Sequence, residues 1–263
     1  MKPQVYQDPR PADFFDRYHE RVRTRRPDWV YRTARVLLTG PCWLVYRARA
    51  IGTERVPESG PVIVAPNHFS NFDHFFLAMF LRREVQFMAK SQLFTPPLDF
   101  ILSHGGTFPV RRGQHDEEAF RTAYTILGRG GLVGMYAEGG RSRSKQLGTP
   151  KPGLGRLALE SGAAVVPVAI HGSENVREVR RLRFPKVTIA FGKPIVFDSV
   201  EGPDKELCQW ASAEVFDRVR QLYHVVSTEG RRGVLERVRR DPDRGSIEPV
   251  LLQPERERET VGA

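Results

Sequence analysis

Cysteine is scarce in this chain of 263 residues, and long apolar runs are missing. The two cysteines, Cys42 and Cys208, stand far apart and in no metal-ligand spacing, which favours inert thiols in a reducing compartment. No stretch reaches the roughly 20 apolar residues that a membrane-spanning helix needs. The N-terminal region is polar and charged, so we expect no secretory signal. These absences favour a globular protein on the cytoplasmic side, without disulfides.

Positive charge exceeds negative charge, since 41 Lys and Arg against 31 Asp and Glu give a formal net charge of +10. Such a surplus favours a polyanionic partner, namely nucleic acid, an anionic bilayer or a phosphorylated substrate. Apolar residues make up 40% of the chain, enough for a buried core of ordinary size. Charge by itself does not choose among the three partners.

Residues 1–48 are expected to form a surface arm followed by an amphipathic segment. Within Trp29–Tyr46, an apolar stretch is interrupted by Arg32, Arg35 and the pair Gly40–Pro41, which predicts two short amphipathic helical pieces. Aromatic side chains beside arginines suit the boundary between lipid and water. We therefore expect peripheral or monotopic contact with an anionic membrane surface at the cytoplasmic face. The alternative is a helix packed on its own domain.

Residues 49–226 read as one α/β domain, and residues 227–263 as a charged, disordered tail. Short apolar runs rich in β-formers occur at 61–65, 85–89, 132–136, 164–170 and 187–191. Helical patterns occur at 73–83, 117–127, 154–160 and 205–226, and Gly162 is placed to stop the third of them. This alternation predicts a mostly parallel central sheet flanked by helices.

A histidine and a carboxylate, His68 and Asp73, stand where the first of these strands meets the first helix. A histidine oriented by a carboxylate is able to act as a general base near neutral pH. Positions i and i+5 lie about 140° apart on a helix, so the pair meets only if His68 precedes the helix that Asp73 begins. Ser70 or Asn71 would then cap the helix. The alternative is a capped strand-to-helix junction with an incidental histidine.

Three further motifs follow in the chain: Gly105–Arg111 (GGTFPVR), Glu138–Ser142 (EGGRS) and Val165–Val168 (VVPV). In parallel sheets, ligands gather at the carboxyl ends of strands, where the second of these loops would sit. An arginine in a glycine-rich loop suits bidentate recognition of phosphate. The plain alternatives are surface arginines, an ion pair between Glu138 and Arg141, and an ordinary core strand.

Together and in this order, the four motifs resemble those of the glycerolipid acyltransferases. They read Asn-His with four residues to Asp, Gly-x-x-Phe-x-x-Arg, Glu-Gly-x-Arg-Ser and Val-x-Pro-Val. The pattern is most similar to that of the 1-acylglycerol-3-phosphate (lysophosphatidic acid) acyltransferases. The resemblance covers roughly residues 50–200, which is the α/β part of the chain.

This resemblance implies transfer of an acyl group from acyl-CoA or acyl carrier protein, as co-substrate, to a lysophospholipid hydroxyl, giving phosphatidic acid. It implies no further cofactor and no metal. His68 would be the general base and Asp73 its orienting partner. Substrate-binding positions carried over from the family motifs are Asn67, Lys90, Gly105, Phe108, Arg111, Glu138, Gly139, Arg141, Ser142, Val166 and Pro167.

The third motif departs from the family pattern, because Ala137 and Gly140 stand where proline and threonine are usual. The lost hydroxyl leaves the acceptor open, and glycerol 3-phosphate, a lyso-ornithine lipid or a glycolipid are alternatives. From other classes, His68, Asp73, His74 and His104 could serve as metal ligands of a hydrolase. A basic nucleic-acid- or lipid-binding protein is the other rival, although no nucleic-acid motif is present and we expect no such partner.

Overall fold

A nine-stranded, mostly parallel sheet forms the centre of the computed structural model, which describes residues 8–114, 116–142, 144–176, 182, 184–241 and 246–251. The strand order is β1-β7-β6-β2-β5-β3-β4, with β8 pairing β6 and β9 pairing β8. Only the β6–β7 and β6–β8 pairs are antiparallel among these. The bounds are β1 (Arg49–Ile51), β2 (Val62–Pro66), β3 (Val85–Lys90), β4 (Phe108–Val110), β5 (Leu132–Gly134), β6 (Ala164–His171), β7 (Thr188–Phe191), β8 (Ile195–Phe197) and β9 (Glu248–Val250).

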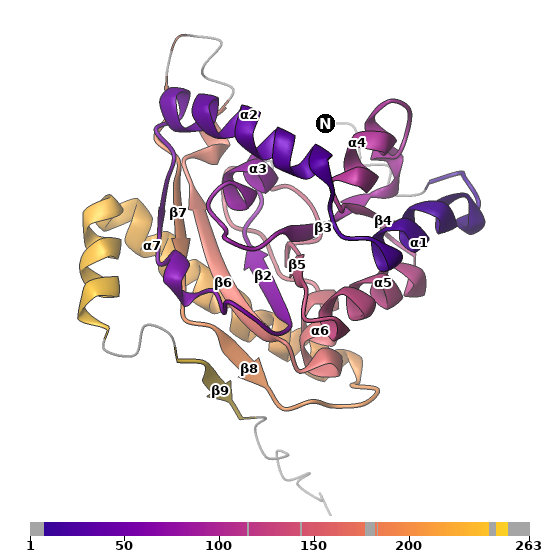
Figure 1. Ribbon diagram of the computed structural model, residues 1–263. Helices are drawn as coiled ribbons and strands as arrows, with labels where there is room; N and C mark the ends of the chain where they lie inside the picture. The colour runs from indigo at the N-terminus through magenta and orange to yellow at the C-terminus, as the bar shows by residue number, and fades with distance from the viewer. Residues whose placement is uncertain are drawn as a thin grey trace, which may run out of the picture.

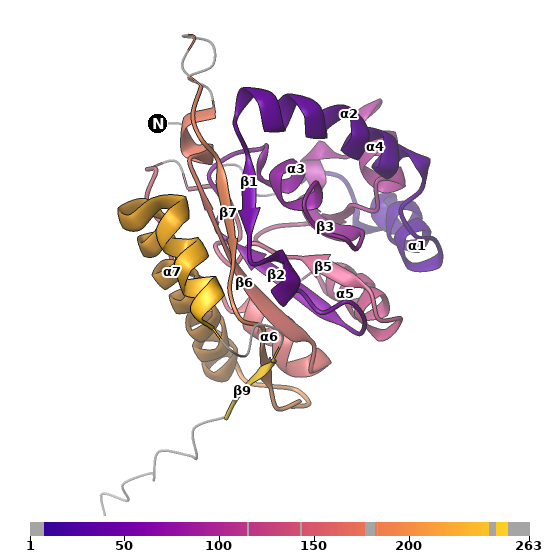
Figure 2. The same cartoon turned by 60° about the vertical axis from the view of Figure 1, so that its left-hand side comes forward.

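Helices cover both faces of this sheet, which confirms the predicted α/β class (Figures 1 and 2). Successive side chains of a strand point to opposite faces. Ile63 accordingly packs in the cluster that contains residues of α5, α6 and α7, whereas Val62 packs in the cluster with α3. The helices are α1 (Asp16–Thr24), α2 (Trp29–Val45), α3 (Asp73–Ala78), α4 (Leu98–His104), α5 (Glu117–Gly128), α6 (Gly153–Ser161) and α7 (Lys205–Arg240), with 3₁₀ turns η1 (Ala12–Phe15), η2 (Thr53–Arg55) and η3 (Ser91–Leu93).

One helix ends as its local sequence predicts, and another ends earlier because of tertiary contacts. α6 ends as predicted at Gly162, whose φ of +58° lies in the left-handed region. α3 ends at Ala78, earlier than the predicted Arg83. The side chain of Arg83 instead donates to the backbone carbonyls of Pro57 and Gly60, which ties this loop to the start of β2. Tertiary hydrogen bonds therefore outweigh the helical pattern of this segment.

The N-terminal residues from Phe15 to Thr24 are not a surface arm. Phe15, Tyr18 and Val22 are buried, and the Tyr18 hydroxyl donates to Asp99 Oδ2 of α4 at 2.8 Å. Their spacing of three and four residues places them on one face of a helix, and that face packs against the domain. The average charge of this segment concealed its apolar stripe.

The segment that follows is one helix, α2, rather than two pieces. Pro41 lacks the N–H that would bond the carbonyl of Leu37, a residue whose side chain points to solvent. Water is able to hydrate a carbonyl in that position, so the helix continues through the proline. None of the helices in the described ranges is both long and apolar enough to cross a membrane.

The predicted tail is also partly structured. α7 continues past Val226 to Arg240 with a kink at Gly230, and β9 adds to the sheet beside β8. Val226, Val234 and Val238 are buried against Ala169 and Ala190 of the sheet. Most charged residues between them are exposed, but Arg231 donates to Thr188 Oγ1 of β7 at 2.9 Å. Residues 252–263 lie outside the described residues, so the prediction stands untested there.

Candidate active site

The loop between β2 and α3 carries the histidine, and an asparagine fixes where this loop leaves the sheet. Asn67 is fully buried at the end of β2. Its Nδ2 donates to the carbonyl of Ile170 at 3.0 Å, and its Oδ1 accepts from the Ile170 N–H at 2.7 Å. The amide is thus engaged by the neighbouring strand β6. This places Asn67 in support of the loop, not in contact with a substrate as the sequence predicts.

His68 and Asp73 meet in the geometry that the spacing requires, with His68 before α3 and Asp73 as its first residue. His68 Nδ1 lies 2.9 Å from Asp73 Oδ2. The same oxygen accepts the backbone N–H groups of Phe69 and Ser70, each at 2.8 Å. Phe72 is the N-cap, which corrects the prediction of Ser70 or Asn71. The Asp73 carboxylate thus binds N–H groups of the loop before α3, and Ser70 Oγ accepts the Phe72 N–H at 3.2 Å.

Aromatic rings enclose the imidazole of His68, which is 4% exposed. Tyr136 stacks on it at 4.0 Å between ring centroids, and His74 meets it edge-on at 5.3 Å. Burial lowers the pKa of His68 below its ordinary value, although Asp73 opposes this. Burial also lowers the pKa of His74 to about 4. Because Nδ1 faces Asp73, Nε2 is the nitrogen of a neutral His68 that is available to accept a proton.

A cavity of about 390 Å³ opens beside His68. Most of its lining is apolar and comes from α2, α3, β3 and α4, with Tyr31, Leu38, Met79, Phe87, Leu98 and Ile101 among the lining residues. Four cations also line it: Arg35, Lys90, Arg112 and Arg141. An apolar chain and an anionic group are therefore both accommodated next to the same imidazole.

The Glu-Gly-Gly-Arg-Ser loop holds His68 from the other side. Glu138 Oε1 accepts the His68 N–H, and Oε2 accepts the Gly148 N–H, both at 2.9 Å. Burial raises the pKa of Glu138, and these two N–H donors oppose the rise. The Ser142 N–H donates to the His68 carbonyl at 2.9 Å. Gly139 takes a left-handed turn (φ +65°) that allows the loop to double back.

The predicted substrate-binding residues therefore divide into three groups. Lys90, Gly105 and Arg141 line the cavity together with His68. Glu138, Gly139, Ser142 and Asn67 shape the loops that hold His68. Phe108, Val166 and Pro167 are buried outside the cavity lining, in the packing of the sheet. That last placement corrects their predicted substrate contact, because their side chains are used by neighbouring strands and helices.

The arginine of the second motif shifts by one position. Arg112, not Arg111, lines the cavity, and the Arg111 N–H donates to Asp116 Oδ2 at 2.6 Å. Sequence reasoning also missed Tyr136 and considered His74 only as a metal ligand, whereas both rings pack on His68. The doubled arginine was a visible signal for Arg112. Nothing in the local pattern distinguished Tyr136 from an ordinary strand residue.

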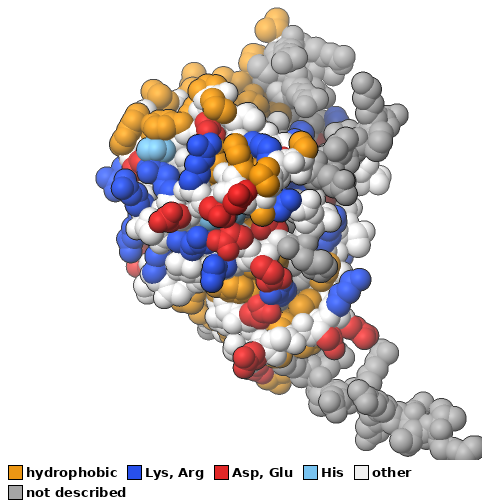
Figure 3. All heavy atoms as spheres, turned by 90° about the vertical axis from the view of Figure 1, so that its right-hand side faces the viewer, with side chains coloured by type: hydrophobic (Ala, Val, Ile, Leu, Met, Phe, Trp, Pro, Cys, Tyr) orange, Lys and Arg blue, Asp and Glu red, His pale blue; other side chains and the backbone are white. Residues whose placement is uncertain are grey.

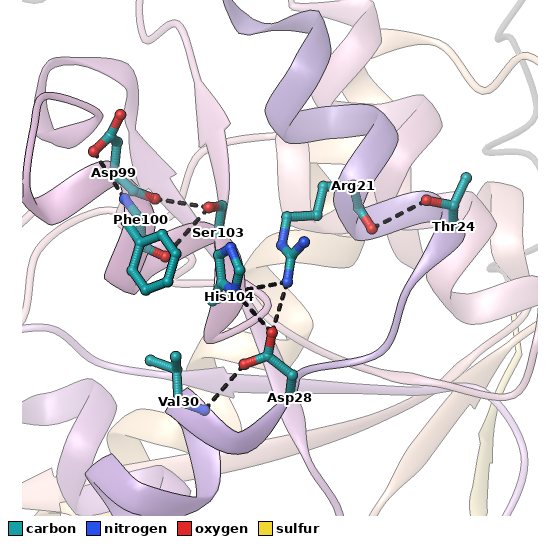
Figure 4. A network of polar contacts seen from close by, with 8 residues as sticks. All are labelled: Arg21, Thr24, Asp28, Val30, Asp99, Phe100, Ser103 and His104. Carbon is teal, nitrogen blue, oxygen red and sulfur yellow. Dashed lines mark hydrogen bonds and ion pairs between the residues drawn. The ribbon is translucent and has the colours of Figure 1, made fainter.

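The predicted metal alternative lacks its ligand cluster. Within the described part of the chain, no group of three or more His, Cys, Asp or Glu side chains is arranged to hold a metal ion. His104 lies instead in a network at the end of α4, where its Nδ1 is 2.8 Å from Asp28 Oδ2 and 2.8 Å from an Arg21 nitrogen (Figure 4). His104 is thus committed to joining α4 to α2.

The sheet, the loop that carries His68, and a cavity lined by both apolar and cationic residues are together the features of an acyltransferase-like α/β protein. Residues 47–171 match the family model described as Acyltransferase, which confirms the resemblance inferred from the motifs. A solved structure, the 1-acyl-sn-glycerophosphate acyltransferase PlsC from Thermotoga maritima, shares the fold with a TM-score of 0.58 at 21% identity. The match covers 80% of this chain and 88% of that one.

The names of the curated relatives give two activities, 1-acyl-sn-glycerol-3-phosphate acyltransferase and glycerol-3-phosphate acyltransferase. The chloroplastic 1-acyl-sn-glycerol-3-phosphate acyltransferase of Arabidopsis thaliana is 27% identical over 157 residues, covering 57% of this chain and 44% of that protein. A glycerol-3-phosphate acyltransferase of Pseudomonas fluorescens is 27% identical over 214 residues, covering 65% of this chain and 25% of that protein. The chain thus spans less than half the length of these two relatives.

Proposed function

We propose that this protein is an O-acyltransferase that moves a fatty acyl group from a thioester to the free hydroxyl of 1-acylglycerol 3-phosphate, giving phosphatidic acid. The observation that carries the proposal is the His68 imidazole, with Nδ1 2.9 Å from Asp73 Oδ2, on the wall of an apolar cavity that also carries cations. The donor is acyl-CoA or acyl carrier protein. No resident cofactor is part of the proposal.

The chemistry begins at His68 Nε2, which takes the proton of the acceptor hydroxyl as that oxygen attacks the thioester carbonyl. Asp73 holds the Nδ1–H and stabilises the imidazolium that forms, as the aspartate of a serine protease triad does. The tetrahedral intermediate then expels the thiolate, which receives the proton from His68. The base acts directly on the substrate alcohol, so no acyl-enzyme forms.

The cations of the cavity support a phosphate-bearing acceptor. Arg112 and Arg141 line the same cavity as His68, and a guanidinium binds a phosphate through two parallel hydrogen bonds. Lys90 lines the cavity as a further point charge. The apolar wall formed by α2, α3 and α4 then holds an acyl chain, because burying each methylene group contributes about 0.8 kcal/mol.

The membrane, at its cytoplasmic face, is the proposed source of the lysophospholipid acceptor. Five large apolar side chains of α2 are exposed: Trp29, Val36, Leu37, Trp43 and Leu44. Arg49 lies over the Trp43 ring at 5.1 Å, a pairing that suits the headgroup boundary. Together with the positive net charge, this favours peripheral attachment to an anionic surface rather than association with nucleic acid.

The test is acyl transfer from labelled acyl-CoA to a panel of acceptors, with His68→Ala and Arg112→Ala beside the wild type. We expect transfer to a lysophosphatidic acceptor, a loss of about 10²- to 10⁴-fold in kcat for His68→Ala, and a raised acceptor KM for Arg112→Ala. Near-wild-type turnover by His68→Ala would disprove the mechanism.

Glycerol 3-phosphate is the second candidate acceptor. Two observations favour it: a named glycerol-3-phosphate acyltransferase matches 65% of this chain, and Gly140 stands where the lysophosphatidic type usually has threonine. The same panel decides between the two acceptors, since both carry a phosphate but only one carries an acyl chain. Preference for the unacylated acceptor would replace the first assignment.

A further inference from the structure

A second exposed apolar surface lies on α4 and the start of α3. Phe100 and Ile101 of α4 are each 49% exposed, Leu98 is 38% exposed, and Phe75 of α3 is 41% exposed. In Figure 3, hydrophobic side chains gather along the upper left edge, at the level that α2 and α4 occupy in Figure 1. The acidic residue of α4, Asp99, is turned inward to the Tyr18 hydroxyl. The outward side of α4 is therefore apolar.

This surface is continuous with the cavity. Phe75, Leu98 and Ile101 line the cavity and are exposed at the same time, so they form part of its rim. An amphiphile that enters between α3 and α4 keeps its chain in contact with apolar side chains from the surface to the interior. Exposed apolar groups at a cavity rim are costly in water unless another apolar phase covers them.

α4 is also held to α2, the helix proposed to touch the membrane. Asp28, the N-cap of α2, accepts the Val30 N–H through Oδ1 at 3.0 Å and faces His104 of α4 through Oδ2 at 2.8 Å. The Asp28 N–H donates to the His104 carbonyl at 3.1 Å, and Phe100 stacks on the His104 ring at 3.9 Å (Figure 4). The two helices therefore present one surface.

Exposed arginines lie on α1 and α2, the helices that contact α4, and the Arg32 side chain is 3.5 Å from Glu84. Arg17 of α1 lies 3.9 Å from Asp99 of α4 with 62% of its side chain exposed, and Arg32 of α2 is 76% exposed. Apolar side chains beside exposed arginines match the layered chemistry of an anionic leaflet, whose headgroups are negative and whose interior is apolar.

We propose that α4 is a second membrane-inserting element, and that an anionic phospholipid bilayer covers the exposed apolar surface of Phe75, Leu98, Phe100 and Ile101. Lipids then enter the cavity between α3 and α4 without leaving the bilayer. The entry route rests on the proposed function, whereas the membrane contact of α4 does not.

The test measures binding of the purified chain to vesicles containing phosphatidylglycerol, by flotation without substrate. Phe100→Ser changes an exposed residue that does not line the cavity, and we expect about 5- to 10-fold weaker partitioning, from the loss of one partly buried aromatic ring. Leu37→Ser on α2 should weaken it similarly. Leu235→Ser is the matched control, because Leu235 is 38% exposed on α7, away from α4, and should leave binding unchanged.

Three outcomes separate the possibilities. If Leu37→Ser weakens vesicle binding but Phe100→Ser does not, then α2 alone contacts the membrane and the proposal is overturned. If Phe100→Ser instead abolishes a dimer seen by light scattering, with vesicle binding intact, a second copy covers α4 and the proposal is also overturned. If Phe100→Ser weakens binding while the wild type transfers no acyl group to any acceptor, the membrane contact of α4 holds and the proposed function fails.

Discussion

Glu138→Ala removes the acceptor of two buried backbone N–H groups, those of His68 and Gly148, which it binds at 2.9 Å each. A hydrogen bond to a charged group contributes about 1.5–3 kcal/mol, so we expect the free energy of unfolding to fall by about 3–6 kcal/mol. Glu138→Gln keeps one acceptor oxygen but turns an amide N–H toward the other donor, so its free energy of unfolding should lie between those of the wild type and Glu138→Ala.

The same change acts on catalysis through position, because Glu138 does not line the cavity. Loss of the bond to the His68 N–H frees the loop, and a displacement of about 1 Å at a reacting group can cost about 10²-fold in rate. We therefore expect kcat to fall by about 10²-fold in Glu138→Ala while the KM for the acceptor changes little. Urea unfolding and steady-state kinetics on the same samples measure both effects.

A second variant approaches the same contact from the other side. A Cβ at Gly148 would lie 2.6 Å from Glu138 Oε2, so Gly148→Ala should displace the carboxylate and lower both stability and kcat. Glu117→Ala is the control, because this exposed glutamate forms a surface ion pair with Arg156 worth about 0–1 kcal/mol. A Glu138→Ala protein with wild-type stability and only a raised acceptor KM would refute the reasoning and restore Glu138 as a substrate contact.

Three further changes follow from the site. Because burial lowers the pKa of His68, the activity should persist below pH 6.5, the ordinary histidine value, and an acid limb centred above about 6.5 in a kcat/KM profile would contradict this. Asp73→Asn should lower kcat by about 10²- to 10⁴-fold in steady-state assays, because an amide does not stabilise the imidazolium as a carboxylate does. A loss of kcat below about tenfold would show that Asp73 is dispensable. His74 has a pKa of about 4 in the folded state, so between that pH and about 6.5 the unfolded chain binds more protons and stability falls as the pH is lowered. His74→Gln should reduce this loss of stability in urea unfolding between pH 7 and pH 4, and an unchanged pH dependence would refute the assignment.

Much of the architecture followed from local pattern. The runs that became β2, β3 and β6 are apolar at nearly every position, as strands buried on both faces must be. The N-terminal and C-terminal segments were misjudged because their average charge is high. Their buried residues, such as Tyr18 and Val234, form narrow stripes whose meaning depends on a partner surface elsewhere in the chain.

The sequence by itself determined the order of the candidate site residues along the chain: a histidine and its carboxylate, then two arginine-bearing loops. It also required His68 to precede the helix that Asp73 begins, since the i to i+5 spacing allows no other meeting. Only the tertiary structure decided which of these residues line the cavity beside His68. Asn67 and Glu138 turned out to support His68 through partners about 70 to 100 residues away, and Arg112 took the place in the cavity lining expected of Arg111. Strand register and loop packing set those contacts, and both depend on residues far apart in sequence.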